Sequence, residues 1–227
     1  MQETMDAYKL DFARFLIRAQ ALQFGEFTLK SGRISPYFFN SSCFDTGPLI
    51  HELGRFYARG ILARTPQCSV VFGPAYKGIP LCVATAEALS ELSKKPIGYF
   101  FNRKEKKPHG DGGTLVGKVP ISEEVVVMVD DVITDGQTKV EAIELVRQEC
   151  QVDIREIWVA VDRLERNTEG RNAAADLQAR TGVAVQAIAT IRELCDALDG
   201  VVVEGRPVIS SEQRVRIERY LEEYGVS

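Results

Sequence analysis

Short apolar runs alternate with helical patterns through most of the chain. The runs are rich in β-branched residues and almost wholly apolar, which is typical of strands buried on both faces of a sheet. Five such strands are predicted, at residues 69–72, 97–102, 125–129, 154–161 and 183–189. Helical patterns lie between them, at residues 77–93, 136–150 and 173–180. The alternation predicts an α/β protein with a five-stranded, mostly parallel sheet flanked by helices.

Periodic patterns also occupy the two ends of the chain. Apolar residues recur at helical spacing in residues 8–22 and 49–61, which predicts two amphipathic helices. Between them, residues 24–40 are rich in aromatic side chains, glycine and hydroxyls, and predict irregular or short-strand structure over an edge of the sheet. Ser210 and Gln213 have the spacing of a capping box, which predicts the start of a last helix.

Composition and charge narrow the class of partner. The chain has 227 residues and a formal net charge of -4, the balance of an ordinary globular protein. Nucleic-acid and membrane surfaces need clustered Lys and Arg in excess, so we expect neither partner and favour a small molecule. The five cysteines are scattered and form no C-x-x-C pair. This usage favours reduced thiols in a cytoplasmic protein over a disulfide framework or a zinc site.

One segment interrupts the alternation of strands and helices. Residues 103–113 are charged and glycine-rich and have no apolar periodicity, which predicts a long loop between two core strands. A charged loop of this kind is either a solvated linker or a lid over a binding site. Its own composition leaves both interpretations open.

A predicted strand that ends in two acids carries the strongest chemical signal. In residues 125–138 an apolar strand ends at Asp130 and Asp131, and a turn with Thr134 and Gly136 then leads into a helix. Ligands of open α/β sheets bind at the carboxyl ends of strands, and a helix N-terminus with free N–H groups attracts phosphate. The acids can accept hydrogen bonds from a ribose diol and stabilise a cationic ribose. The alternative is a solvated strand end with Thr134 as an N-cap.

This segment resembles the phosphoribosyl pyrophosphate loop of type I phosphoribosyltransferases. Three more segments are similar, in order, to the hood, the pyrophosphate loop and the catalytic lid of bacterial members that act on orotate: 24–40, 72–80 and 101–110. The resemblance implies one phosphoribosyltransferase domain over residues 1–227, with a small N-terminal hood contributed mainly by 1–45 and a mobile lid at 103–117. It also implies a cis peptide bond between Ala75 and Tyr76.

The resemblance implies transfer of a phosphoribosyl group from 5-phosphoribosyl 1-pyrophosphate to orotate, a step of pyrimidine synthesis. The implied catalytic residues are Lys107, His109, Asp130 and Asp131. The residues implied to bind the ribose donor are Tyr76, Lys77, Arg103, Lys104, Lys107, His109, Asp130, Asp131, Val132, Ile133, Thr134, Asp135, Gly136, Gln137 and Thr138. The residues implied to bind orotate are Lys30, Phe38, Phe39, Thr134 and Arg163.

Taken without the resemblance, some of these residues have plainer interpretations. Arg163 would form a surface ion pair with Glu165, and the Phe38 and Phe39 rings would be core. The chain also departs from the family at Asp135, where a small neutral residue is usual and where a carboxylate repels phosphate unless it points outward.

The resemblance also implies a cofactor and a partner. Mg²⁺ would be held through substrate oxygens, and of the side chains only Asp130 and Asp131 are candidates to touch it. A homodimer is implied, in which lid residues act in trans on the neighbouring subunit. Two other functions stay open: transfer to a different base, and a regulator that senses the ribose donor without catalysis.

Overall fold

The computed structural model describes residues 5–29, 32–105, 113–133, 136–167 and 169–226. Its centre is a six-stranded sheet with the order β5-β4-β3-β6-β7-β8. The strands are β3 (Val70–Gly73), β4 (Gly98–Asn102), β5 (Leu115–Gly117), β6 (Val126–Val132), β7 (Ile154–Asp162) and β8 (Ala184–Thr190). All neighbours are parallel except β5, which pairs antiparallel with β4. The predicted fold class and its five strands are confirmed, and β5 is an additional edge strand.

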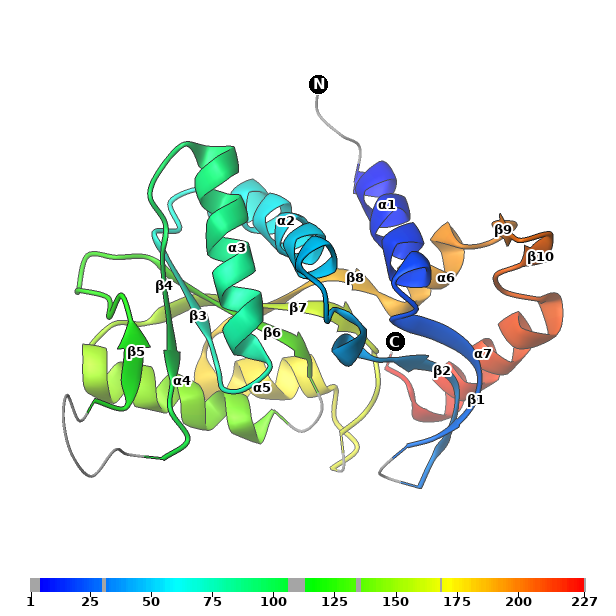
Figure 1. Ribbon diagram of the computed structural model, residues 1–227. Coiled ribbons are helices and arrows are strands. Elements are labelled where there is room, and N and C mark those ends of the chain that lie inside the picture. The colour runs from blue at the N-terminus through cyan, green and yellow to red at the C-terminus, as the bar shows by residue number, and fades with distance from the viewer. Residues whose placement is uncertain (1–4, 30–31, 106–112, 134–135, 168, 227) are drawn as a thin grey trace.

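Helices cover both faces of the sheet. The helices α2 (Gly47–Arg64) and α3 (Gly78–Ser93) lie on one face, and α4 (Gln137–Cys150) and α5 (Ala173–Thr181) lie on the other (Figure 1). Strand side chains alternate between the two layers, as the pleat requires. In β3, Val71 belongs to the core under α2 and α3, whereas Val70 and Phe72 belong to the core under α4 and α5. All four helices coincide closely with the predicted ones.

The ends of the chain form a smaller unit beside the sheet. Its elements are α1 (Met5–Arg18), β1 (Leu22–Thr28), β2 (Ile34–Phe39), the 3-10 helix η1 (Ser41–Cys43), α6 (Ile191–Ala197), β9 (Val202–Val203), β10 (Arg206–Pro207) and α7 (Ser211–Tyr224). The region expected to be irregular or short strands is the antiparallel hairpin of β1 and β2. The helix α1 packs on β8 and α6, and α7 packs on β2.

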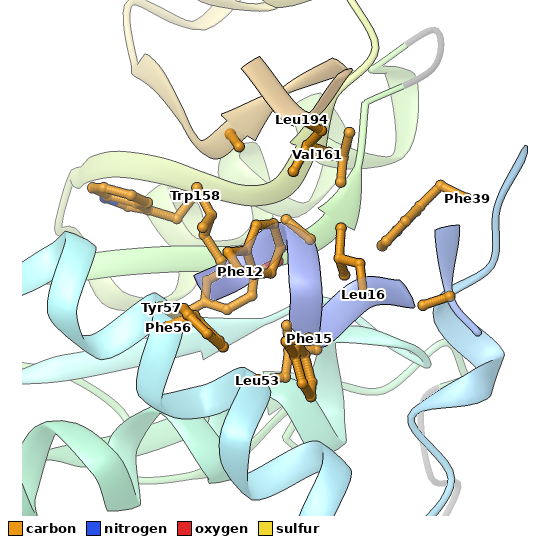
Figure 2. Close-up of a cluster of buried hydrophobic side chains, with 14 of the residues drawn as sticks. Phe12, Phe15, Leu16, Phe39, Leu53, Phe56, Tyr57, Trp158, Val161 and Leu194 are labelled. Atoms are coloured by element: carbon orange, nitrogen blue, oxygen red, sulfur yellow. The ribbon is translucent and has the colours of Figure 1, made fainter. Parts of the chain in front are cut away.

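An aromatic cluster fixes the N-terminal helix on the sheet. Figure 2 shows Phe12 and Phe15 of α1 beside Phe56 of α2. The Phe56 ring centroid lies 5.1 Å from that of Phe12 and 5.3 Å from that of Phe15, within the range of favourable aromatic pairs. Trp158 of β7 belongs to the same buried cluster. The N-terminal helix is therefore held against the sheet by buried contacts.

Capping boxes start two of the C-terminal helices. The predicted box at Ser210 is present: its hydroxyl accepts from the Gln213 N–H, and the Gln213 side chain accepts from the Ser210 N–H. Thr190 and Glu193 form a second box that starts α6. Among the helices that the structure describes, none combines the length and the apolarity that a bilayer crossing demands.

Candidate active site

The polar residues singled out from the sequence gather where parallel strands end. Asp130 and Asp131 lie near the end of β6, and Arg163 follows β7 directly. Lys77 follows the turn after β3 and caps α3. Since β3, β6 and β7 are parallel, their carboxyl ends open on the same edge of the sheet. A hydrogen bond between Ser41 and Asp131 connects this edge to the N-terminal part of the chain.

Asp131 is the centre of a three-residue polar network. Its Oδ2 accepts from the Ser41 hydroxyl at 2.6 Å and from the Lys77 Nζ at 2.9 Å. The same Lys77 nitrogen donates to the Ser41 hydroxyl at 2.8 Å. Burial alone would raise the pKa of Asp131, but the hydrogen bonds from Ser41 and Lys77 outweigh it and hold the pKa below its ordinary value. The network therefore keeps Asp131 ionised at the mouth of the site.

Asp130 has a different environment from its neighbour. Its Oδ2 accepts from the Lys139 Nζ at 2.6 Å, and the two side chains are only 13% and 8% exposed. The Tyr57 hydroxyl donates to the Asp130 carbonyl at 2.7 Å. Burial raises the pKa of Asp130 above its ordinary value, although the charge of Lys139 opposes that shift. Asp130 is thus a buried ion-paired acid, and Asp131 faces the site.

The turn that leads into α4 has the form of an anion cradle. Gly136 is the N-cap of α4 and has a φ of 74°, a left-handed conformation that glycine adopts without strain. Its carbonyl accepts from the N–H groups of Lys139 and Val140. Gln137 and Thr138, the first two helical residues, are exposed. An exposed helix N-terminus at this place favours a bound phosphate through its N–H groups and the positive end of the helix dipole.

Two glycines allow the turn between β3 and α3 to close. A Cβ on Gly73 would lie 2.0 Å from the Gly78 carbonyl oxygen, and one on Gly78 would lie 2.7 Å from the Gly73 carbonyl carbon. The peptide bond between Ala75 and Tyr76 is cis, which confirms the prediction. The Ala75 N–H donates to the Asn102 side-chain oxygen at 2.9 Å, and this bond ties the turn to the end of β4.

Basic side chains lie beside this turn. The Lys104 Nζ is 4.9 Å from the centroid of the Tyr76 ring, whose side chain projects into solvent. Arg103 is anchored through its backbone N–H, which donates to the Thr114 carbonyl at 2.7 Å. Its Nη1 is buried and has no hydrogen-bond partner among the described residues. A buried charged donor without a partner is available to an anionic ligand.

The two phenylalanines expected to face the acceptor base have different surroundings. The Phe38 ring stacks on Phe27 of the neighbouring strand, with centroids 5.5 Å apart. Phe39 is buried in the core and packs 6.3 Å from the Phe44 ring. Phe39 also lines a cavity of about 200 Å³ together with Ser41, Lys77 and Asp131. This strand of the hood therefore borders the acid site.

Arg163 is held in place by Glu165 and by Tyr37, which directly precedes those two phenylalanines. Its Nε and Nη2 donate to the Glu165 Oε1 at 3.0 and 2.6 Å, and its guanidinium lies 5.0 Å from the centroid of Tyr37. The Tyr37 hydroxyl donates to the same Glu165 oxygen at 2.7 Å. The ion pair with Glu165 is present, but it is largely buried, with the side chains 13% and 15% exposed. Arg163 is thus oriented at the end of β7 beside the hood.

Several predicted site residues lie outside the described part of the chain. They are Lys30, Lys107, His109, Thr134 and Asp135. Within residues 5–29, 32–105, 113–133, 136–167 and 169–226, no group of three or more His, Cys, Asp or Glu side chains could hold a metal ion.

Ser41, Lys139 and Tyr37 belong to the site although sequence reasoning did not single them out. Ser41 contacts an acid 90 positions away in the chain, and no local pattern signals such a contact. Lys139 had a signal, because a lysine in the first turn of a helix opposes the helix dipole and needs an anionic partner. Tyr37 stands in the aromatic run of residues 24–40, next to the two phenylalanines that are predicted to bind orotate.

Solved structures of phosphoribosyltransferases share this fold. The orotate phosphoribosyltransferase from Francisella tularensis superposes on this chain with a TM-score of 0.80 and is 30% identical. The match covers 95% of this chain and 100% of that protein. Adenine phosphoribosyltransferase from Saccharomyces cerevisiae, at 16% identity and a TM-score of 0.56, is similar in fold alone. The sheet, the acid pair at the end of β6 and the turn after β3 define a type I phosphoribosyltransferase.

Sequence relatives narrow the class further. An orotate phosphoribosyltransferase from Methylococcus capsulatus is 48% identical over 86% of this chain and 91% of its own. Another, from Bifidobacterium animalis, is 43% identical over 99% of this chain and 100% of its own. No family model matches the chain. The chain belongs to the orotate phosphoribosyltransferase family.

Proposed function

We propose that this enzyme transfers the phosphoribosyl group of 5-phosphoribosyl 1-pyrophosphate to orotate. The products are orotidine 5′-monophosphate and pyrophosphate, which serve pyrimidine synthesis. The observation that carries the proposal is the ionised Asp131 between Ser41 and Lys77, placed between the α4 cradle and the turn after β3. This arrangement offers an acceptor for a sugar diol between two anion-binding turns.

The ribose donor is proposed to lie across the end of β6. The turn at residues 134–138 grips the 5′-phosphate through N–H groups and hydroxyls. Asp131 accepts hydrogen bonds from the ribose hydroxyls, and the second negative charge of Asp130 lies directly behind it. As the C1–O bond breaks, the ribose gains cationic character. The fixed negative charge of the two acids stabilises that cationic transition state more than it stabilises the ground state.

The leaving pyrophosphate is proposed to meet the positive side chains around the turn after β3. Lys77, Arg103 and Lys104 surround it, and Tyr76 contributes from the turn itself. Lys107 and His109 join from the lid. Positive donors stabilise the charge that develops on the leaving oxygen. A histidine is the side chain best suited to give that oxygen a proton near neutral pH.

The acceptor base is proposed to lie between the hood and the ends of β6 and β7. Lys30, Phe38 and Phe39 border one side, and Thr134 and Arg163 border the other. A planar guanidinium suits a carboxylate or carbonyl edge, and Glu165 and Tyr37 hold that guanidinium in place. A ring nitrogen of orotate then forms the new bond to C1 as the C1–O bond to pyrophosphate breaks, and the proton of that nitrogen passes to solvent.

Mg²⁺ fits this site as an ion carried by the substrate. The Oδ2 atoms of Asp130 and Asp131 already accept from Lys139 and Lys77, and the described residues offer no cluster of three ligating side chains. Pyrophosphate and ribose oxygens would supply most of the ligands, with waters completing the set. When bound, the ion neutralises charge on the leaving group.

A homodimer with each lid acting on the neighbouring subunit is also part of the proposal. A variant lacking Lys107 and a variant lacking Asp131 should each be inactive, and a mixture of the two should regain part of the activity. No recovery after confirmed subunit exchange would mean that the lid acts in cis.

We place the reaction in the cytoplasm, in keeping with the five free cysteines.

An orotate assay tests the proposal directly. The ultraviolet absorbance of orotate should fall only when enzyme, ribose donor and Mg²⁺ are all present. Persistent absorbance with folded protein would refute the proposal. Turnover of other free bases side by side would reveal a transferase with a different acceptor. Binding of the donor without any turnover would instead identify a regulator that senses the donor.

A further inference from the structure

A buried lysine lies directly behind the acid pair. Lys139 points its Nζ at the Asp130 Oδ2, 2.6 Å away, and its side chain is 8% exposed. Among the described lysines it is the one that is buried. It comes from the first turn of α4, the same turn that forms the phosphate cradle. The pair therefore joins the cradle to the end of β6.

The position of Lys139 is unfavourable without Asp130. A cation in the first turn of a helix opposes the helix dipole, and a buried ammonium loses its hydration. Both costs are offset when a carboxylate accepts a hydrogen bond from the ammonium at close range. Asp130 supplies that carboxylate, because it lies at the end of the strand that leads into the helix. Each member of the pair thus accounts for the burial of the other.

Each oxygen of Asp130 already accepts a hydrogen bond from the protein. Its Oδ2 accepts from Lys139, its Oδ1 accepts from the Asp131 N–H at 2.9 Å, and its carbonyl accepts from Tyr57. The residue as a whole is 9% exposed. A ribose hydroxyl would have to enter a buried ion pair to reach the Oδ2 of this carboxylate.

Asp131 differs from Asp130 in that its lysine partner is exposed. Its Oδ2 is bound by Lys77, whose side chain is 63% exposed and free to move into solvent or toward an anion. Exchange of an exposed lysine for a ribose hydroxyl costs far less than exchange of a buried one. The adjacent acids therefore differ in how readily they can accept a ligand.

We propose that Lys139 is a positioning residue that divides the acid pair: it anchors Asp130 as a buried structural anion and leaves Asp131 to bind the ribose hydroxyls. This division rests on the proposed function, because it assigns the ribose of the donor to one acid. By tying β6 to the first turn of α4, the Lys139–Asp130 pair also fixes the distance between Asp131 and the phosphate cradle.

A direct contact between Lys139 and the 5′-phosphate is the competing role. It would require the Nζ to leave Asp130 and emerge from a side chain that is 8% exposed. The two roles differ in what happens when the pair is replaced by neutral residues of similar size. A positioning pair tolerates that replacement, whereas a phosphate ligand does not.

The test compares Lys139→Met, the double variant Asp130→Asn with Lys139→Met, and Asp131→Asn. Lys118→Met is the control, since Lys118 is an exposed lysine paired with Glu124. Lys139→Met leaves a buried carboxylate without its partner and should lower the Tm by roughly 6 °C or more. It should also raise the KM for the ribose donor by about tenfold, because Asp131 and the cradle shift relative to each other.

The double variant should regain at least half of the lost Tm and half of the change in log KM. Asp131→Asn, which should be inactive, should raise the Kd of the donor in calorimetry by about tenfold or more with a smaller change in Tm. A double variant that binds the donor no better than Lys139→Met would overturn the division, because Asp130 or Lys139 would then touch the substrate. A Tm loss and rescue with an unchanged KM would overturn the positioning role.

Wild-type measurements separate this inference from the proposed function. If the wild type consumes no orotate but binds the donor in calorimetry, the proposed function fails. The division of the acids is then decided by the Kd of the donor across the same variants. If orotate is consumed and the double variant is not rescued, the proposed function stands and the division fails.

Discussion

Replacement of Ser41 by alanine should weaken binding of the ribose donor. The Ser41 hydroxyl donates to the Asp131 Oδ2 at 2.6 Å and accepts from Lys77 at 2.8 Å, so one substitution removes two contacts of the network. A hydrogen bond to a charged group contributes about 1.5–3 kcal/mol. Because Asp131 keeps its bond to Lys77, we take about 1.5 kcal/mol, which is about tenfold in the Kd of the donor.

Calorimetry with the donor and Mg²⁺ measures that Kd, and steady-state turnover of orotate gives the matching KM. Ser42→Ala is the control, because Ser42 is the exposed neighbouring serine and its backbone N–H, rather than its hydroxyl, donates to the Asn40 side chain. Ser41→Ala should bind the donor about tenfold more weakly than Ser42→Ala. Equal Kd values for the two variants would refute the role given to the Ser41 hydroxyl.

Acid stability should change in the same variant. The hydrogen bonds from Ser41 and Lys77 hold the pKa of Asp131 below its ordinary value despite burial. Such a carboxyl stabilises the fold above its unfolded pKa, and this stabilisation is lost as the pH falls through the folded pKa. Without the serine, the folded pKa of Asp131 rises toward its ordinary value. Ser41→Ala should therefore begin to lose stability at a higher pH than the wild type, as denaturant unfolding across an acid pH series would reveal.

Three further changes have definite outcomes. Gly73→Ala should abolish donor binding in calorimetry, since the new Cβ would lie 2.0 Å from the Gly78 carbonyl oxygen; normal binding would contradict the account of this turn. Ser210→Ala should cost about 1 kcal/mol, or a few degrees of Tm, because α7 loses its cap; an unchanged Tm would show that the capping box adds nothing. Burial raises the pKa of Cys68, Cys82 and Cys195 to about 12. A thiol reagent should therefore modify the two other cysteines first in folded protein, and equal rates at all five would contradict this burial.

Most of the fold was predictable because its strands are buried on both faces. Runs such as residues 125–129 must be apolar throughout, and the helices between them must be amphipathic, so the order of elements is visible in the sequence. The strand β5 escaped prediction because three residues show no period, and its pairing with β4 is a tertiary contact. The helix α6 is only seven residues long and was missed for a similar reason.

The site was predictable where it is local and not where it depends on distant contacts. The acid pair, the glycine of the α4 turn and the cis peptide bond after Ala75 all lie in continuous motifs. The residues that form hydrogen bonds with these acids do not lie in such motifs. Ser41 reaches Asp131 only because the hood folds over the sheet, and Lys139 is buried only because β6 and α4 bring it behind Asp130. Periodicity alone would place Lys139 in solvent.

The most direct test of the account is a crystal structure with the ribose donor and Mg²⁺ bound. We predict that a ribose hydroxyl lies within hydrogen-bonding distance of the Asp131 Oδ2, in the place that Lys77 now occupies, with the 5′-phosphate on the first turn of α4. A donor bound elsewhere, with Asp131 still paired to Lys77 and the α4 turn empty, would contradict it.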